Sequence, residues 1–184
     1  METITTRFDT AWSIDPMHSQ IGFKVKHLMF TNVRGKFNDY SARIRTAGND
    51  FTSVQIEVQI ESKSINTNDE KRDEHLRSAD FFDTDTFKAI SFKSDRIEKT
   101  MKSGYYNLFG ELTIKGIRKR IRLEVESGGI IKDPWRNEKA IFNVSGRINR
   151  KDWDLNWNAA LEAGGVLVSD DVWLNCEIEL VHAT

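Results

Sequence analysis

The chain has 184 residues, of which 39% are hydrophobic and 30% are charged, and only two are prolines. This length and composition predict one folded domain with a buried core and exclude a disordered chain. A net charge of -1 gives no overall attraction to nucleic acid or to an acidic membrane surface.

The N-terminal segment METITTRFDTAWSIDP has no apolar stretch followed by a small-residue cleavage site. This predicts no export signal and a cytoplasmic location. No apolar run approaches the roughly 20 residues that a membrane-spanning helix needs, so we expect no stable membrane insertion. We expect residues 1–10 to form a tail and residues 11–184 to form a single domain.

The dominant pattern along the chain is an alternation of apolar and polar residues, which is typical of half-buried β-strands. In SVQIEVQIE the apolar side chains from Val54 to Ile60 alternate with Gln and Glu. The same period recurs at residues 21–25, 40–44, 90–92, 106–114, 121–125, 142–148 and 172–180. Turn residues separate these runs, so the sequence predicts an all-β fold of about eight antiparallel strands that close into a barrel.

One segment breaks this period, INTNDEKRDEHLRSADFFD. Thr67 and Glu70 match the capping-box pattern, which predicts that a short helix starts there. Its few apolar residues indicate that the helix packs at one end of the barrel. We expect Arg72, Asp73 and His75 to form a structural cluster that holds the helix in place.

The histidines, the cysteine and the candidate nucleophiles lack the spacings that are typical of metal sites and catalytic motifs. His18, His27, His75 and His182 lack the spacing of metal ligands, so we predict no metal site. No G-x-S-x-G or comparable signature orients a nucleophile, and we assign no catalytic residue from the spacing. His18 is out of phase with the apolar residues and is expected to brace a strand entry through local hydrogen bonds. Cys176 alternates with apolar neighbours and is interpreted as a core residue.

The segment IRKRIRLEV places Arg118, Arg120 and Arg122 on one face of a predicted strand, and Glu124 and Glu126 continue that face. Platforms that stack nucleic-acid bases interleave aromatic residues with cations, and none occur here. We therefore interpret this face as the solvated outside of the barrel and expect no nucleic-acid partner.

Several motifs, in order along nearly the whole chain, resemble the YceI family. They are W-S-I-D-P-x-H-S-x-I-x-F-x-V-x-H at residues 12–27, G-K-F at 35–37, S-I-N-T-x-x-x-x-R-D-x-H-L at 64–76, D-F-F-D at 80–83, I-S-F-K-S at 90–94, G-E-L-T-I-K-G at 110–116, I-N-R-x-D-W at 148–153 and V-S-D-x-V at 168–172. Three positions depart from the usual pattern. Lys88 stands where Pro is frequent, Arg118 where Thr is frequent, and Asp154 where Gly is usual.

The resemblance implies an elongated, lipocalin-like barrel that is partly closed by a helix and holds a long apolar ligand along its axis. The implied ligand is a polyisoprenoid, an isoprenoid quinone or a similar lipid, bound for transport or storage, with no cofactor and no catalytic residue. The family is often dimeric, so a homodimer is expected. A long ligand is also physically reasonable, because each buried CH₂ contributes about 0.8 kcal/mol and micromolar binding requires on the order of twenty buried carbons.

We expect the ligand to contact side chains on the inward, mostly apolar faces of the barrel. The predicted contact residues are Phe23, Val25, His27, Phe37, Ile56, Ile65, Phe92, Leu112, Phe142 and Trp157. Whether the aromatic rings line an open cavity or fill the barrel is left open by the alternation, since an eight-stranded barrel allows either.

His27 is the polar member of this set, in phase with Ile21, Phe23 and Val25. One hypothesis is that it forms a hydrogen bond with the polar end of the ligand, as polar groups in apolar pockets commonly do. The other is that it is a core histidine paired with a neighbouring carboxylate or carbonyl. A different class of function, an enzyme that modifies a hydrophobic substrate with His27 as general base, is the alternative to binding.

Overall fold

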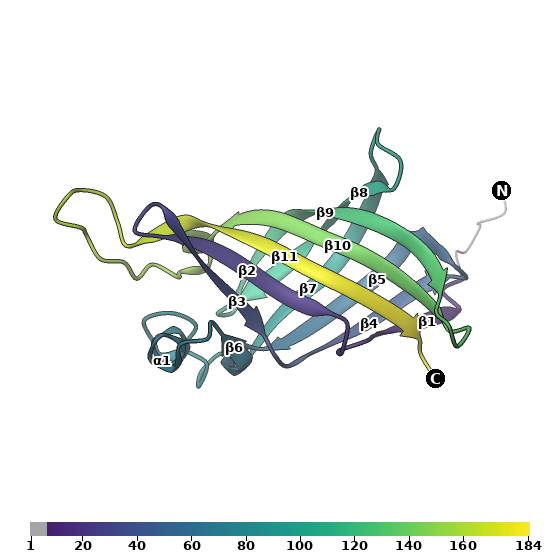
Figure 1. Ribbon diagram of the computed structural model, residues 1–184, viewed down its shortest axis with the longest axis horizontal. Helices are drawn as coiled ribbons and strands as arrows, with labels where there is room; N and C mark the ends of the chain where they lie inside the picture. Colours follow the sequence, from purple (N-terminus) through teal and green to yellow (C-terminus); the bar gives the residue numbers. More distant parts are fainter. Residues whose placement is uncertain (1–6) are drawn as a thin grey trace.

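The computed structural model describes residues 7–184 and shows a closed antiparallel β-barrel (Figure 1). The strands are β1 (Thr10–Ile14), β2 (Gln20–His27), β3 (Thr31–Phe37), β4 (Tyr40–Ala47), β5 (Asp50–Glu61), β6 (Ile65–Asn66), β7 (Ala89–Lys99), β8 (Tyr105–Ile114), β9 (Ile117–Lys132), β10 (Glu138–Asn149) and β11 (Val168–His182). One α-helix, α1 (Glu70–Arg77), and two short 3₁₀ segments, η1 (Ser62–Ser64) and η2 (Arg150–Trp153), complete the elements. Residues 1–6 of the predicted tail lie outside the described residues, and β1 begins at Thr10.

The barrel has eight strand positions because three of them are each divided into two segments. β1 and β2 both pair with β11, β4 pairs with β1 while β3 pairs with β2, and β5 pairs with β4 while β6 pairs with β3. From β7 to β11 each strand pairs with the next, and the pairing of β1 with β11 closes the ring. The predicted eight-stranded antiparallel barrel is therefore confirmed.

The predicted short helix is α1, which lies at one end of the barrel (Figure 1). The predicted capping box is wrong. The N-cap is Asp69, whose carboxylate accepts the backbone N–H of Arg72 at 3.1 Å. The chain passes through a left-handed conformation at Asn68 (φ 61°) just before the cap, which takes Thr67 out of the capping position.

Thr67 instead connects the helix to the segment that precedes it. Its backbone N–H donates to the buried Asp73 carboxylate at 2.9 Å, and its hydroxyl donates to the same group. Arg72 donates from Nε to the Thr67 hydroxyl at 2.7 Å and from Nη2 to the Thr67 carbonyl at 2.8 Å. His75 Nε2 lies 2.8 Å from Asp80 Oδ2, and the His75 ring packs edge-on against Trp157. These contacts agree with a structural role for the predicted cluster.

The corner between β1 and β2 is held by an ion cluster on the barrel wall. His18 Nδ1 lies 2.8 Å from Asp15 Oδ2, which confirms the predicted local bracing by His18. Lys139 of β10 contacts both Asp15, at 3.3 Å, and Glu179 of β11. Donor atoms of Asp15, His18 and Glu179 lie within 4.8 Å of one another, a spacing that would suit a metal ion. Because the Lys139 ammonium already contacts both carboxylates, we interpret the cluster as a structural ion pair network.

The three arginines of β9 face outward, as predicted. Arg118, Arg120 and Arg122 are exposed and form ion pairs with Glu111, Asp95 and Glu124. In the described part of the chain, no helix has the length and hydropathy needed to cross a membrane.

Candidate ligand-binding site

The inward faces of the strands enclose an apolar cavity of about 200 Å³. Side chains on β1, β2, β4, β5 and β7 through β11 line it, and nearly all are Ile, Leu, Val or Phe. Cys176 also lines the cavity, as its predicted core role requires. Burial raises the pKa of the Cys176 thiol to about 11, so it is protonated and unreactive at neutral pH.

Aromatic rings narrow this cavity without filling it. The Phe51 and Phe142 rings pack with centroids 5.0 Å apart, and the Phe92 ring lies against the backbone at Gly110. A Cβ at position 110 would come within 2.5 Å of the Phe92 ring, so only glycine permits this approach. The free volume lies below the range of about 300 to 1,000 Å³ that is typical of small-molecule sites. A ligand of twenty carbons therefore needs some of these rings to rotate.

The structure distributes the ten predicted contact residues over three places. Four of them line the cavity: Ile56, Phe92, Leu112 and Phe142. Four others belong to the packed cluster at the α1 end of the barrel: Phe23, Phe37, Ile65 and Trp157. Val25 and His27 lie near the end of β2 and line neither the cavity nor this cluster.

His27 is half-buried at the last position of β2, where it lies opposite Thr31 and Val168. Its imidazole forms no hydrogen bond and no ion pair with any residue that the structure describes. No carboxylate orients it as a general base would require, and it does not line the cavity where a ligand anchor would be needed. Its role as an anchor stays a prediction that no contact supports.

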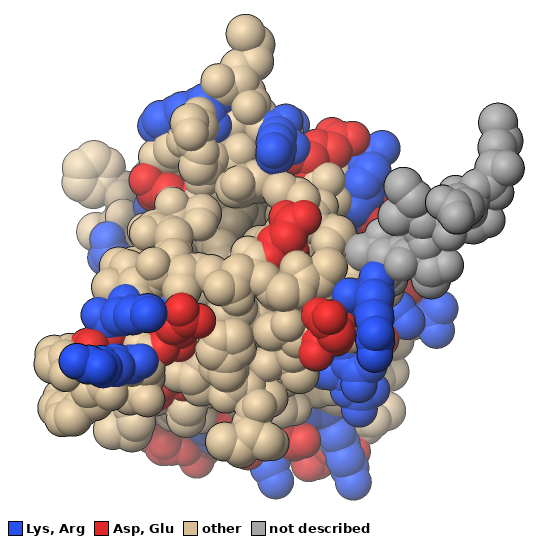
Figure 2. All heavy atoms as spheres, turned by 90° about the vertical axis from the view of Figure 1, so that its right-hand side faces the viewer, with Lys and Arg blue, Asp and Glu red and all other residues tan. Residues whose placement is uncertain are grey.

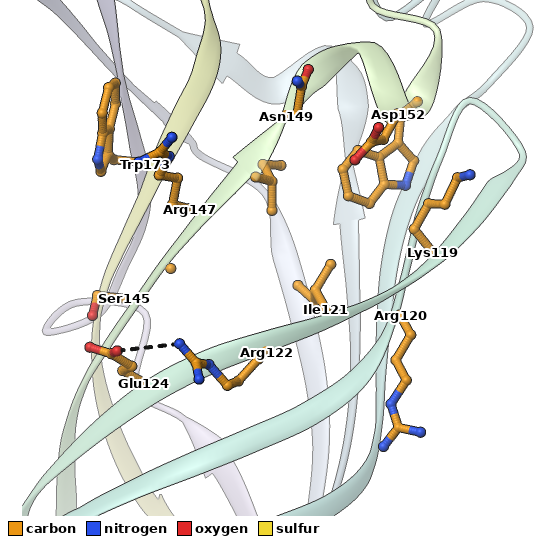
Figure 3. A pocket seen from close by; sticks show the side chains of 13 residues that line it. Lys119, Arg120, Ile121, Arg122, Glu124, Ser145, Arg147, Asn149, Asp152 and Trp173 are labelled. Atoms are coloured by element: carbon orange, nitrogen blue, oxygen red, sulfur yellow. Dashed lines mark ion pairs between the residues drawn. The ribbon is translucent and has the colours of Figure 1, made fainter.

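A second pocket, of about 600 Å³, opens through the barrel wall between β9 and β10 (Figure 3). We call it the slot. Pairing between these strands ends at Ser145 opposite Glu124, after which β9 pairs only with β8 and β10 only with β11. If the register continued, Arg147 would lie directly opposite Arg122, and like charges in that position destabilise a sheet. The strands separate where this contact would form.

The slot has a charged rim and shares one lining side chain with the apolar cavity. Ile121 projects into the space between the strands and lines both the slot and the cavity (Figure 3). The rim carries four cations, Lys119, Arg120, Arg122 and Arg147, against two carboxylates, Glu124 and Asp152. Arg122 pairs with Glu124 at 3.9 Å, and Arg147 pairs with Asp171 at 2.7 Å beside Trp173.

Lys119 differs from the other rim cations because it lies on the inward face of β9. It is in phase with Ile117, Ile121 and Leu123, while the neighbouring arginines face outward. Lys119 is exposed at the slot and forms no ion pair with the residues that the structure describes. Lys119 is not among the contact residues predicted from the sequence, although a lysine between two inward isoleucines was a visible signal.

One end of the slot is closed by Trp153 of η2, a side chain that is 1% exposed. Its indole N–H donates to the Leu112 carbonyl of β8 at 3.1 Å. Asp154, which follows, adopts a left-handed conformation with φ 59°. Glycine adopts this conformation at lower cost than other residues, so the expected glycine would also suit this position.

Comparison with known families and proteins agrees with this architecture. Residues 12–180 match the family model described as the YceI-like domain. The UPF0312 protein SA2479 of Staphylococcus aureus (strain N315) is 36% identical over 171 residues, which cover 92% of this chain and 96% of the relative.

Solved structures share the fold. The Campylobacter jejuni YCEI protein is 33% identical with a TM-score of 0.71, covering 100% of this chain and 99% of that chain. BcnA of Burkholderia cenocepacia is 20% identical with a TM-score of 0.77, over 93% of this chain and 99% of that chain. A polyisoprenoid binding domain from Saccharophagus degradans is 15% identical with a TM-score of 0.67, over 95% of this chain and 100% of that chain.

Proposed function

Because the chain belongs to the YceI-like domain family, we propose that it binds a long apolar ligand inside the barrel without turnover, as a carrier or store. The observation that carries this proposal is the apolar cavity, which is lined from every strand position of the barrel. The ligand class that we propose is a polyisoprenoid, an isoprenoid quinone or a similar lipid. A domain with the same fold, from Saccharophagus degradans, is described as polyisoprenoid binding.

The ligand's polar end is proposed to lie in the slot, next to Lys119. Ile121 lines both pockets, and we infer that a ligand in the cavity reaches the slot past this side chain. The Lys119 ammonium is free to donate to a phosphate, carboxylate or quinone oxygen there. This replaces His27 as the proposed polar anchor.

Binding is favoured over the enzyme alternative by the surroundings of His27. A general base needs a partner that orients the imidazole, and no described side chain forms a hydrogen bond or an ion pair with it. The cavity itself is lined by groups that stabilise an apolar chain and carry no acid–base pair. A homodimer and a cytoplasmic location stay predictions from the sequence.

The proposal is tested by titrating the protein with prenyl alcohols of increasing chain length. Affinity should rise with each added unit until the cavity is full, since each buried CH₂ contributes about 0.8 kcal/mol. Ile56→Trp should block binding because it fills the cavity, while Gln55→Trp, on the outer face of the same strand, should leave binding unchanged. If Ile56→Trp does not fold, Cys176→Phe blocks the same space from β11. Affinity that does not depend on chain length, or that survives the blocking variant, would contradict binding in the cavity.

A further inference from the structure

The hairpin between β2 and β3 projects beyond one end of the barrel, beside the loop of residues 159–167 (Figure 1). Large apolar side chains are exposed there: Phe30 is 86% exposed, Met29 60%, Leu28 51% and Val166 40%. We call these four residues the apolar tip. Its side chains are far more exposed than their size and hydrophobicity would otherwise favour.

Leu28 and Met29 adopt a backbone conformation that is unfavourable for residues with large side chains. Leu28 and Met29 both have positive φ, 51° and 62°, in a turn where the Phe30 N–H donates to the His27 carbonyl at 3.2 Å. Turns with positive φ at both central positions strongly prefer Asn-Gly, because other side chains are disfavoured in the left-handed region. Leu and Met therefore lower stability at these positions.

The two segments of the tip support each other. The Leu28 N–H donates to the Leu167 carbonyl at 2.9 Å, and the Met29 side chain lies over Gly165. A Cβ at Gly165 would lie 2.0 Å from Met29 Sδ. The hairpin and the loop thus form one convex, braced structure that holds the apolar side chains outward.

The strands behind the tip carry only positive charge. Lys24, Lys26, Arg34 and Lys36 lie on the outer face of β2 and β3, and we call them the cationic face. No Asp or Glu occurs anywhere in residues 16–38. By contrast, the opposite end of the barrel mixes acidic and basic side chains (Figure 2).

The positive charges of the cationic face do not stabilise the sheet. Lys24 and Arg34 are directly opposite each other in the pairing of β2 with β3, which is an unfavourable arrangement. None of the four cations forms an ion pair with a described residue. The cationic face therefore has a free capacity to bind anions over a broad area next to the tip.

We propose that the apolar tip and the cationic face together dock the protein, reversibly, on a membrane surface that contains anionic lipids. Amphipathic surfaces of this kind insert apolar side chains at the boundary of headgroups and acyl chains while their cations contact lipid headgroups. A convex tip fits into a deformable bilayer, and a folded protein partner would need a matching groove. This surface is separate from the ligand cavity, and the proposal does not depend on the ligand's identity.

The test is co-sedimentation of the protein with vesicles of phosphatidylcholine alone or of phosphatidylcholine mixed with phosphatidylglycerol. The protein should bind the mixed vesicles, release as salt rises, and bind the neutral vesicles weakly. The double variant Leu28→Asn, Met29→Gly should bind the mixed vesicles roughly tenfold more weakly. Because Asn-Gly suits the turn, this variant should unfold at the same or a higher temperature than the parent protein. Phe30→Ser should weaken binding in the same way and leaves the turn residues unchanged.

Charge is tested by Lys24→Gln with Arg34→Gln, which should weaken binding to mixed vesicles roughly tenfold and lower the salt dependence. Matched controls are Met101→Ser, another exposed methionine on a different turn, and Arg43→Gln with Arg45→Gln on β4. Neither control should change binding. The proposal is overturned if the parent protein does not bind mixed vesicles, or if the tip variants bind as well as the controls. Sedimentation showing a tip-dependent dimer in place of vesicle binding would overturn it in favour of a second copy of the chain.

Discussion

At the scale of single residues, Lys119 shows how one side chain changes the chemistry of an apolar barrel face. It occupies an inward position of β9 between Ile117 and Ile121, yet it is exposed because the wall opens beside it. A lysine in a closed barrel would be costly to bury without a partner. The opening of the wall therefore explains how a lysine is tolerated on this face, and Lys119 is the proposed anchor for the polar end of a ligand.

Lys119→Leu should weaken binding of a prenyl phosphate by about tenfold or more, which is the loss expected for a hydrogen bond to a charged group. Binding of the prenyl alcohol of equal length should change little, and so should the free energy of unfolding. The matched control is Arg118→Gln, one residue away on the outer face. Equal losses for the phosphate and the alcohol in isothermal titration would contradict an anchor at Lys119.

The ionisation of Asp15 should make the stability of the fold depend on pH. The hydrogen bond to His18 lowers the pKa of the Asp15 carboxyl, with a further contribution from Lys139. A carboxyl with a lowered pKa in the folded state stabilises the fold above its unfolded pKa of about 3.9, and this stabilisation is lost as pH falls through the folded pKa.

Asp15→Asn should therefore lower the free energy of unfolding near neutral pH by about 1 kcal/mol. The difference from the parent protein should shrink as the pH falls below about 4. Asp85→Asn, an exposed position with no described ion pair, serves as the control in urea unfolding at several pH values. A difference that is constant down to low pH would show that the cluster does not depend on the Asp15 charge.

At the scale of elements, the connection from β6 into α1 depends on Thr67 and two side chains of the helix. Arg72 donates to the Thr67 hydroxyl and carbonyl, and the buried Asp73 accepts two hydrogen bonds from the same residue. These contacts hold the helix at the barrel end, next to the cluster that contains Phe37 and Trp157.

Arg72→Ala should lower the free energy of unfolding by about 1 to 3 kcal/mol, because it removes two hydrogen bonds from a charged donor. Lys71→Ala, on an exposed neighbouring position of the same helix, should change stability by less than about 0.5 kcal/mol. Thermal and urea unfolding of both variants provide the comparison. Equal stability of the two variants would contradict the structural role of Arg72.

At the scale of the whole molecule, the sequence predicted the barrel because alternation reports directly which face of a strand is buried. It did not predict β3, where Gly35 and charged residues interrupt the apolar period. Nor did it predict the capping residue, because the left-handed turn at Asn68 follows from the path of the chain.

The slot could not be predicted from the sequence. Strand separation depends on the register between neighbouring strands, which decides which residues lie opposite each other. Periodicity places Arg122 and Arg147 outward but does not place them opposite each other. The predicted contact residues lie in different parts of the barrel for a similar reason. Ile56 and Phe142 line the cavity alone, Phe37 and Ile65 belong to the packed cluster at the helix end, and Leu112 and Phe92 lie where the two meet. Alternation specifies the face of a residue and not its height along the barrel.

We propose that the barrel holds a long apolar molecule. The most direct measurement is to purify the protein under native conditions, extract it with organic solvent, and identify the extracted molecules by mass spectrometry. We predict a long-chain isoprenoid or similar lipid in near-stoichiometric amount, and its loss from the Ile56→Trp variant but not from Gln55→Trp. An extract without lipid, together with no uptake of added polyprenyl lipids, would contradict the claim and indicate that the aromatic side chains close the cavity.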